Sequence, residues 1–299
     1  MARRTLLTLL FLAALSANTY AEGAVTSAHR MATDAAMEVL NDGGPAASGA
    51  TSEYFSRSGV AARSGMHQAV VPGAWAGWME WLKEFGRLSL DRLLQSAIDI
   101  AESGYPVYPT MAEWLRRGED SIAIWPCSRE IYMPAGELPG EGDTVRQPAM
   151  ARTFRDIQRV YRRNIRRGRT AAFDAANDYY YRGPIAESIV DFSREHDGLF
   201  ELSDFTEFRT GIVEPISIEY RDITVYQNPP NSQGVTMLMA LNILEGFDFG
   251  GYEVNDPETV HLQVEAIKIA HAAKHRHVGD PEYVDVPVEE LISDEHAGE

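Results

Sequence analysis

The chain contains a single cysteine, Cys127, in 299 residues, so no disulfide can form within it. Its fold must therefore be held together by packing, and its apolar fraction of 44% is that of an ordinary globular protein. The length is enough for one large domain or two modest ones. Because a lone cysteine is more often a small core residue than a nucleophile, we expect Cys127 to be buried.

The first 21 residues have the pattern of an export signal. Arg3 and Arg4 give a basic start, an apolar run covers residues 5–17, and Thr19-Tyr20-Ala21 fits a cleavage site. The run is too short to cross a bilayer as a helix, and its alternative is a buried N-terminal helix. We favour export to the periplasm or the outside, because the three parts occur in the order that a signal peptide requires.

The chain is strongly acidic. It has 27 Lys and Arg against 44 Asp and Glu, a net charge of −17. Without Arg3 and Arg4 the balance becomes 25 against 44, or −19. A surface of this charge repels nucleic acid and anionic membranes, so neither is an expected partner.

The spacing of apolar residues predicts a mainly helical chain. Ser89 and Asp256 are N-cap candidates, because each precedes such a run with a side chain that can accept a backbone hydrogen bond. The predicted helices cover residues 31–40, 74–85, 90–102, 109–117, 148–165, 170–178, 184–195, 235–245 and 258–276, with a last turn or two at 287–292.

The helix predicted over residues 74–85 has an aromatic face, which we assign to the core because a stripe at helical spacing usually packs inward. The stripe consists of Trp75, Trp78, Trp81, Leu82 and Phe85. The short connection from this helix to the next favours an αα-hairpin.

One β-hairpin is expected. Residues 216–220 and 223–226 alternate between apolar and polar side chains and flank Arg221 and Asp222. Residues 46–68 and 122–142 are rich in small or turn-forming residues and are predicted to be loops.

The helix predicted over residues 148–165 begins a basic block. One interpretation is a site for an anion or an acidic partner; the other is a solvated face with Phe154, Ile157, Val160 and Tyr161 pointing inward. We favour the solvated face, because arginine stems commonly cover apolar surface. The arginines are Arg152, Arg155, Arg159, Arg162, Arg163, Arg166 and Arg167.

The sequence lacks a Gly-x-Ser-x-Gly elbow, a phosphate-binding Gly-rich loop and a His-Glu-x-x-His motif. His271, His275 and His277 form a metal-like cluster, in which the first two can share a helix face. A zinc site needs further ligands, and Lys274 and Arg276 add positive charge beside the cluster. We therefore expect no metal, and favour a surface helix end whose cations suit the helix dipole.

Several blocks occur in an order that resembles the large subunits of γ-glutamyltransferases. Each block alone is weak, whereas their order along the chain, from residue 23 almost to the end, is specific. They are GAVTSAHRMAT (23–33), VPGAWAGW (71–78), Phe85-Gly86, SAIDIAESGYPV (96–107), GDTVRQPAMARTF (142–154), YYRGPIA (180–186), PPNSQG (229–234), LNILEG (241–246), His261, Glu265-Ala266 and Gly279-Asp280-Pro281.

The resemblance implies an α+β fold of the N-terminal-nucleophile hydrolase type (αββα), of which this chain would be a large-subunit fragment: mostly helical, with a β-hairpin and incomplete central sheets. Members of the family cut themselves, and a threonine becomes the first residue of a small subunit. Its α-amine then serves as general base for its own hydroxyl, which attacks a γ-glutamyl amide such as glutathione. The resemblance implies no metal or organic cofactor.

Two departures limit what the resemblance transfers. The chain ends at Glu299, within the segment that in the family precedes self-cleavage, so we expect the catalytic threonine on a small subunit outside it. The family's arginine that grips the substrate carboxylate has no counterpart after Gly43-Gly44; Arg57 and Arg63 are nearby but lie outside its motif. We therefore assign no catalytic or metal-binding residue, leave the substrate-binding residues unknown, and expect the chain alone to be inactive.

The predicted organisation is a signal peptide over residues 1–21 and a γ-glutamyltransferase large-subunit-like domain over residues 22–299, shortened near residue 45. PPNSQG and an insertion over residues 170–181 resemble the acylase- or oxamate-amidohydrolase-like branch of the family. The alternative function is a non-catalytic relic or binding module that kept the helical shell.

Overall fold

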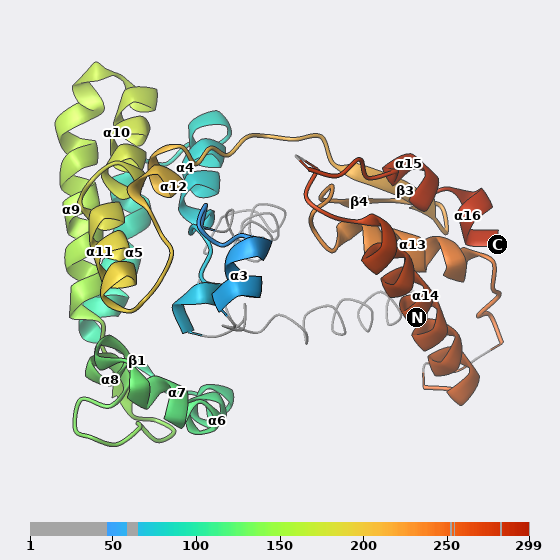
Figure 1. Ribbon diagram of the computed structural model, residues 1–299, viewed down its shortest axis with the longest axis horizontal. Helices are drawn as coiled ribbons and strands as arrows, with labels where there is room; N and C mark the ends of the chain where they lie inside the picture. The colour runs from blue at the N-terminus through green and yellow to red at the C-terminus, as the bar shows by residue number, and fades with distance from the viewer. Residues whose placement is uncertain (1–46, 59–64, 252, 254, 282, 299) are drawn as a thin grey trace. The chain divides into compact units, whose positions relative to one another are not determined.

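The computed structural model describes residues 47–298, apart from 59–64, 252, 254 and 282 (Figure 1). The predicted signal peptide and the helix predicted over residues 31–40 lie outside the described residues. Contacts between Cα atoms divide the chain into two compact units, one over residues 44–210 and another that contains residues 211–299. Within the described part, no helix has both the length and the apolar character needed to cross a bilayer.

The unit over residues 44–210 is almost entirely helical. Its elements are α3 (Ser52–Ser58), the 3-10 turn η1 (Gly65–Gln68), α4 (Ala74–Glu84), α5 (Leu90–Ser103), β1 (Tyr105–Pro106), α6 (Pro109–Arg117), α7 (Glu119–Ile124), α8 (Pro126–Tyr132), β2 (Thr144–Val145), α9 (Pro148–Asn164), the 3-10 turn η2 (Ile165–Arg167), α10 (Arg169–Tyr181), α11 (Pro184–Glu195) and α12 (Leu202–Thr206).

Helix α10 is central to this unit, since it packs on α9, α4 and α11, and α9 in turn packs on α5 (Figure 1). Ala172, Phe173 and Ala176 of α10 are fully buried, and the two alanines let the neighbouring helices approach closely. Phe173 meets the ring of Tyr161 from α9 edge-on, with ring centroids 5.2 Å apart. The core of the unit therefore lies along α10.

Capping and turn residues in the sequence predicted most helix ends correctly. The Ser89 hydroxyl accepts a hydrogen bond from the backbone N–H of Arg92 at the start of α5. The loop predicted over residues 46–68 contains a helix in its described part, since Thr51 Oγ1 accepts from Tyr54 N and starts α3. The loop predicted over residues 122–142 also contains helix: α7 continues to Ile124, and Pro126 opens α8, because proline is well suited to the first turn of a helix.

Three further expectations fail for reasons of tertiary structure. Helices α4 and α5 do not form a hairpin: α4 packs on α10, and α5 on α9. Phe85 lies just past the end of α4 and is 59% exposed, whereas Trp75 is buried in the core as expected. Cys127 sits in the first turn of α8 and is exposed, not buried.

The unit that contains residues 211–299 is built around a hairpin and one buried helix. Its described elements are β3 (Ile216–Tyr220), β4 (Ile223–Gln227), α13 (Gly234–Glu245), α14 (Pro257–His277), α15 (Val288–Leu291) and α16 (Asp294–Gly298). The strands pair antiparallel with Ile218 opposite Val225, as predicted, and both turn residues, Arg221 and Asp222, have positive φ. This backbone suits the tight turn of a two-residue hairpin.

Helix α13 is buried on almost every side. The hairpin, α14, α15 and α16 all pack against it. Leu238, Leu241 and Leu244 lie in a cluster with Ile218 of β3, and Val235 and Met239 pack with residues of α14 and α15. Such all-round burial explains why α13 is apolar on every face instead of amphipathic.

The β3–β4 hairpin is open on three sides. Its two strands pair only with each other among the described residues, so each has a free edge. Glu219, Thr224 and Tyr226 are exposed on its outer face, and Tyr226 is 62% accessible. A two-stranded sheet of this kind is marginally stable by itself, and free strand edges are ready to pair with further strands.

Replacement of Phe173 by alanine tests the central role of α10. We expect Phe173→Ala to lower the free energy of unfolding by about 3–5 kcal/mol, because it empties a fully buried ring site. The matched control, Phe85→Ala, should stay within about 0.5 kcal/mol, because that ring is exposed. All five tryptophans lie between residues 75 and 125, so tryptophan fluorescence in a urea titration reports on this unit. Equal losses in the two variants would contradict the assignment.

Candidate functional site

Two of the blocks quoted above, residues 71–78 and 180–186, meet in the core of the first unit. The buried hydroxyl of Tyr181 donates to the carbonyl of Pro72 and accepts from the backbone N–H of Ala76 at 3.1 Å. Tyr180 stacks on Trp75, with ring centroids 5.7 Å apart and planes 13° from parallel. Burial raises the pKa of Tyr181 above its ordinary value, so the hydroxyl keeps its proton and can donate at neutral pH.

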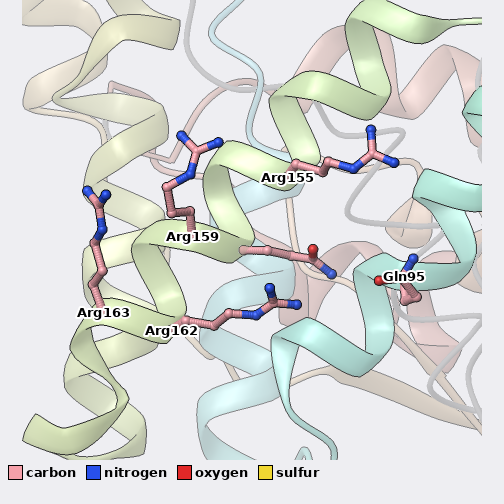
Figure 2. Close-up of a pocket in the computed structure, with 6 residues that line it drawn as sticks. Gln95, Arg155, Arg159, Arg162 and Arg163 are labelled. Atoms are coloured by element: carbon pink, nitrogen blue, oxygen red, sulfur yellow. The ribbon is translucent and has the colours of Figure 1, made fainter.

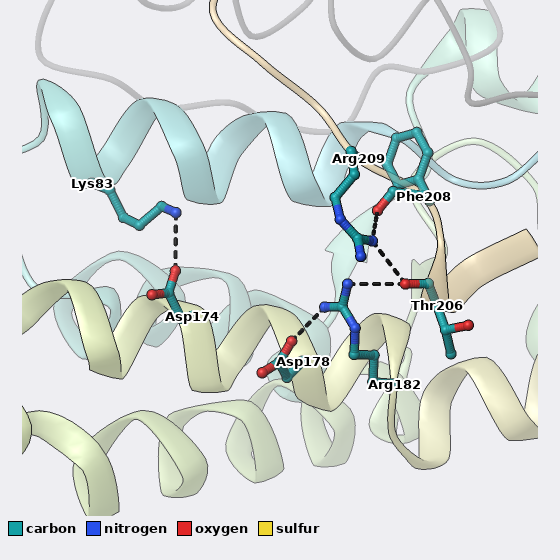
Figure 3. Close-up of polar contacts among 7 residues, drawn as sticks. All are labelled: Lys83, Asp174, Asp178, Arg182, Thr206, Phe208 and Arg209. Atoms are coloured by element: carbon teal, nitrogen blue, oxygen red, sulfur yellow. Dashed lines mark hydrogen bonds and ion pairs between the residues drawn. The ribbon is translucent and has the colours of Figure 1, made fainter. Parts of the chain in front are cut away.

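Charged residues fasten the ends of α10 to its neighbours. Lys83 of α4 pairs with Asp174 at 2.9 Å, and Arg182 reaches from Asp178 to the carbonyl of Thr206 in α12 (Figure 3). At the other end, the guanidinium of Arg169 donates to three carbonyls, those of Leu82, Gly86 and Leu88. These contacts hold α4 and α12 in position.

Another pair of blocks, residues 96–107 and 142–154, forms the short β1–β2 ladder, which the sequence analysis missed. Tyr105 pairs with Val145, and the backbone N–H of Gln147 donates to Ala101 O at 2.8 Å. Gly104, at φ +87°, ends α5, and a Cβ there would lie 2.4 Å from Thr144 Cγ2. The glycine is therefore required by the close approach of the two blocks.

The PPNSQG block is the loop from β4 into α13. Buried Ser232 donates from its hydroxyl to Asn228 O at 3.0 Å and accepts from Gly234 N at 3.1 Å. A Cβ on Gly234 would lie 2.4 Å from Asn228 O, so only glycine fits there. Both hydrogen-bonding roles of Ser232 are taken up inside the loop, so this serine shapes the turn and is not an activated nucleophile.

The LNILEG block on α13 holds the last described segment of the chain. Asn242 is buried, and its Nδ2 donates to the carbonyl of Ile292. Leu291 of α15 is buried in the cluster that contains Val235 and Met239. Residues 288–298 are thus anchored to α13, and their position follows from the position of that helix.

The structure does not assemble the candidate metal residues into a site. The rings of His271 and His275 lie with centroids 6.2 Å apart near the end of α14. Within the described residues no group of three or more His, Cys, Asp or Glu side chains could hold an ion. Arg57 is exposed and pairs with Glu53 of its own helix, and Arg63 lies outside the described residues.

The helix of the basic block has the inward apolar face that we expected, and its arginines lie at the surface. Ile157 and Tyr161 are buried, Phe154 and Val160 are half-buried, and the arginines of α9 and η2 are exposed. The described residues thus supply a scaffold that joins sequence blocks far apart in the chain. We find no described residue whose contacts assign it to bond cleavage.

Comparison with known proteins identifies the scaffold. Residues 23–299 match the family model of gamma-glutamyltranspeptidase. The chain is 31% identical over 263 residues to the glutathione hydrolase-like YwrD proenzyme of Bacillus subtilis, covering 88% of this chain and 47% of that protein. It is 30% identical over 262 residues to the oxamate amidohydrolase proenzyme of Klebsiella pneumoniae, covering 86% and 46%. The chain thus spans about half the length of these curated relatives.

Solved structures agree in fold. The cephalosporin acylase of Bacillus halodurans is 34% identical with a TM-score of 0.74, over 86% of this chain and 46% of that one. The gamma-glutamyltranspeptidase of Helicobacter pylori has a TM-score of 0.75 at 23% identity, over 93% of this chain and 90% of that one. These similarities confirm the expected α+β fold of the N-terminal-nucleophile hydrolase type.

The Tyr181 hydroxyl provides a test of how the first two blocks are joined. Tyr181→Phe should lower the free energy of unfolding by about 1–3 kcal/mol, because it leaves a buried N–H and a carbonyl without a partner. Tyr161→Phe is the matched control, because the buried Tyr161 hydroxyl has no hydrogen-bond partner among the described residues and its removal should be neutral or stabilising. Urea titrations followed by tryptophan fluorescence measure both. A larger loss of stability in Tyr161→Phe than in Tyr181→Phe would contradict the proposed role of the Tyr181 hydroxyl.

The loop before α13 gives a second test. Gly234→Ala should destabilise the second unit by about 1–3 kcal/mol, because the methyl group collides with the Asn228 carbonyl. At Gly246 the nearest atom to a Cβ is Ile243 O at 3.5 Å, so Gly246→Ala should change little. Hydrogen–deuterium exchange of peptides from residues 216–245 measures the difference, and similar exchange in the two variants would refute it.

Proposed function

We propose, since the chain belongs to the gamma-glutamyltranspeptidase family, that it supplies the large-subunit part of an exported amidohydrolase acting on γ-glutamyl amides such as glutathione. The observation that carries the proposal is the family match over residues 23–299. The coverage of about half of each full-length relative fits one subunit of a two-subunit enzyme.

The chemistry would reside on a small subunit that begins with threonine. Its hydroxyl attacks the amide carbonyl while its own α-amine accepts the proton, and an acyl-enzyme forms as the amine leaves. Water or an acceptor amine then takes the acyl group, and preorganised donors must stabilise the oxyanion in each step. The chain described above would contribute the helical frame and the β3–β4 hairpin.

The free edges of the hairpin support the existence of a second subunit. Both edges of the β3–β4 sheet are unpaired among the described residues, and its outer face is uncovered. On β4, Ile223 is exposed. Strands of a second subunit that extend the sheet would satisfy its free edges.

Export and substrate choice belong to the same proposal. The pattern of residues 1–21 supports a periplasmic or secreted enzyme. The relatives carry the names of a glutathione hydrolase-like protein, an oxamate amidohydrolase and an acylase. The identity of the amide substrate therefore differs among them.

An activity assay tests the division of labour. The purified chain alone should release no aniline from a chromogenic γ-glutamyl anilide, because the attacking threonine is supplied by the partner. Addition of the small subunit encoded downstream of codon 299 should give turnover, and the same subunit with its first threonine changed to alanine should give none. Release of aniline by the chain alone would overturn the proposal, as would a downstream sequence with no threonine-initiated small subunit, which favours a relic or binding module.

Hydrogen–deuterium exchange provides a structural readout of the same complex. Both forms of the small subunit, active or with alanine, should slow exchange of the amides of residues 216–227, because new strands pair with the free edges. The amides of α9, in the other unit, serve as the internal control and should not change. Unchanged exchange in the hairpin would refute the proposed role of its edges.

A further inference from the structure

A shallow groove runs between α5 and α9 on the unit over residues 44–210. It has a volume of about 440 Å³ and is lined by two glutamines and four arginines (Figure 2). The lining residues are Gln95, Arg155, Gln158, Arg159, Arg162 and Arg163. We propose that this groove binds a short, extended acidic peptide segment of a partner protein through the guanidinium groups of Arg155, Arg159, Arg162 and Arg163.

The helices that form the groove are net positive in a chain that is otherwise acidic. Helices α5 and α9 with η2 carry eight basic and four acidic residues, a net charge of +4, whereas the whole chain has −17. The remaining residues therefore carry −21. A concentration of positive charge against this background favours an anionic ligand on the face that α5 and α9 form.

Two of the arginines are held in place from α5. Arg155 pairs with Glu102, and Arg162 Nε donates to both carboxylate oxygens of Asp91, at 2.8 and 2.9 Å. The terminal nitrogens of Arg162 make no hydrogen bond within the described residues and remain available. Guanidinium groups that are already positioned lose less side-chain entropy when they bind a carboxylate.

The other two arginines, Arg159 and Arg163, are exposed on α9 (Figure 2). Arg159 pairs only with Asp156 of its own helix, and Arg163 has no partner within the described residues. Arg155, Arg159 and Arg163 follow one another at four-residue steps, a rise of about 6 Å per step. In an extended peptide, alternate side chains lie about 6.6 Å apart, so acidic residues at every second position match this spacing.

The form of the groove favours a short ligand. It is open to solvent, so it suits a chain laid along α9 more than a small molecule enclosed on all sides. A long polyanion such as nucleic acid would extend past the positive face and meet the acidic remainder of the surface. A peptide of about seven residues spans the arginines without that repulsion.

Binding of a labelled heptapeptide tests the proposal. Fluorescence anisotropy with the full chain at about 50 mM salt should show binding of Glu-Ser-Glu-Ser-Glu-Ser-Glu and none of its lysine counterpart, and higher salt should weaken the binding. The double variant Arg159→Gln/Arg163→Gln should weaken it about tenfold, because two charge-assisted contacts are lost. These two arginines are chosen because neither ties α9 to α5.

The matched control removes the same charge elsewhere. Arg116 of α6 and Arg194 of α11 are exposed, and Arg116→Gln/Arg194→Gln should keep the affinity within about twofold. Circular dichroism verifies that both variants fold. An equal loss in the control, no binding by the unmodified chain, or tighter binding of a single-stranded oligothymidylate of the same charge would overturn the proposal.

Discussion

Each compact unit depends on burying one helix among its neighbours. The chain has a single, exposed cysteine, so no covalent link can compensate for poor packing. In one unit, α10 brings two alanines and Phe173 to the point where α4, α9 and α11 converge. In the other, α13 is apolar on all faces because a hairpin and three helices surround it. The elements around them pack so that these two helices are buried.

Features that depend on a few adjacent residues could be predicted from the sequence. The caps at Ser89 and Asp256 and the turn at Arg221-Asp222 follow from local side-chain and backbone chemistry, and the structure contains all three. The separate packing of α4 and α5 could not be predicted, because α4 packs on α10 and α5 on α9. The connection between them is held by Arg169, about 80 residues further along the chain. Pro126 is a second example: it begins a helix, where the preference of proline for turns had predicted a loop.

The candidate site was less predictable than the fold. The sequence blocks that revealed the family turn out to be mutual contacts, such as Tyr181 against Pro72 and Ala76. Their order along the chain identifies the scaffold. No local pattern, however, shows that the hydroxyl of Tyr181 in one block bonds to the backbone of another block. In the same way, the arginine block showed only that α9 has a basic face. The groove depends on Asp91 and Glu102, which lie on another helix and fix two of the guanidinium groups.

The composition of the interior has a consequence for acid tolerance. The buried polar side chains of the described residues are Gln158, Ser193, Ser232, Thr236, Asn242 and Thr259. None of these is a carboxylate or an imidazole, and the guanidinium of Arg169, which fastens α4 and the start of α5 to α10, keeps its charge at any pH a cell meets. Among the described residues, acid therefore meets no fully buried carboxylate or imidazole. The carboxylates that tie α10 to its surroundings, Asp174 and Asp178, lie at the surface. Loss of those ion pairs would loosen contacts around the core without placing a new charge inside it.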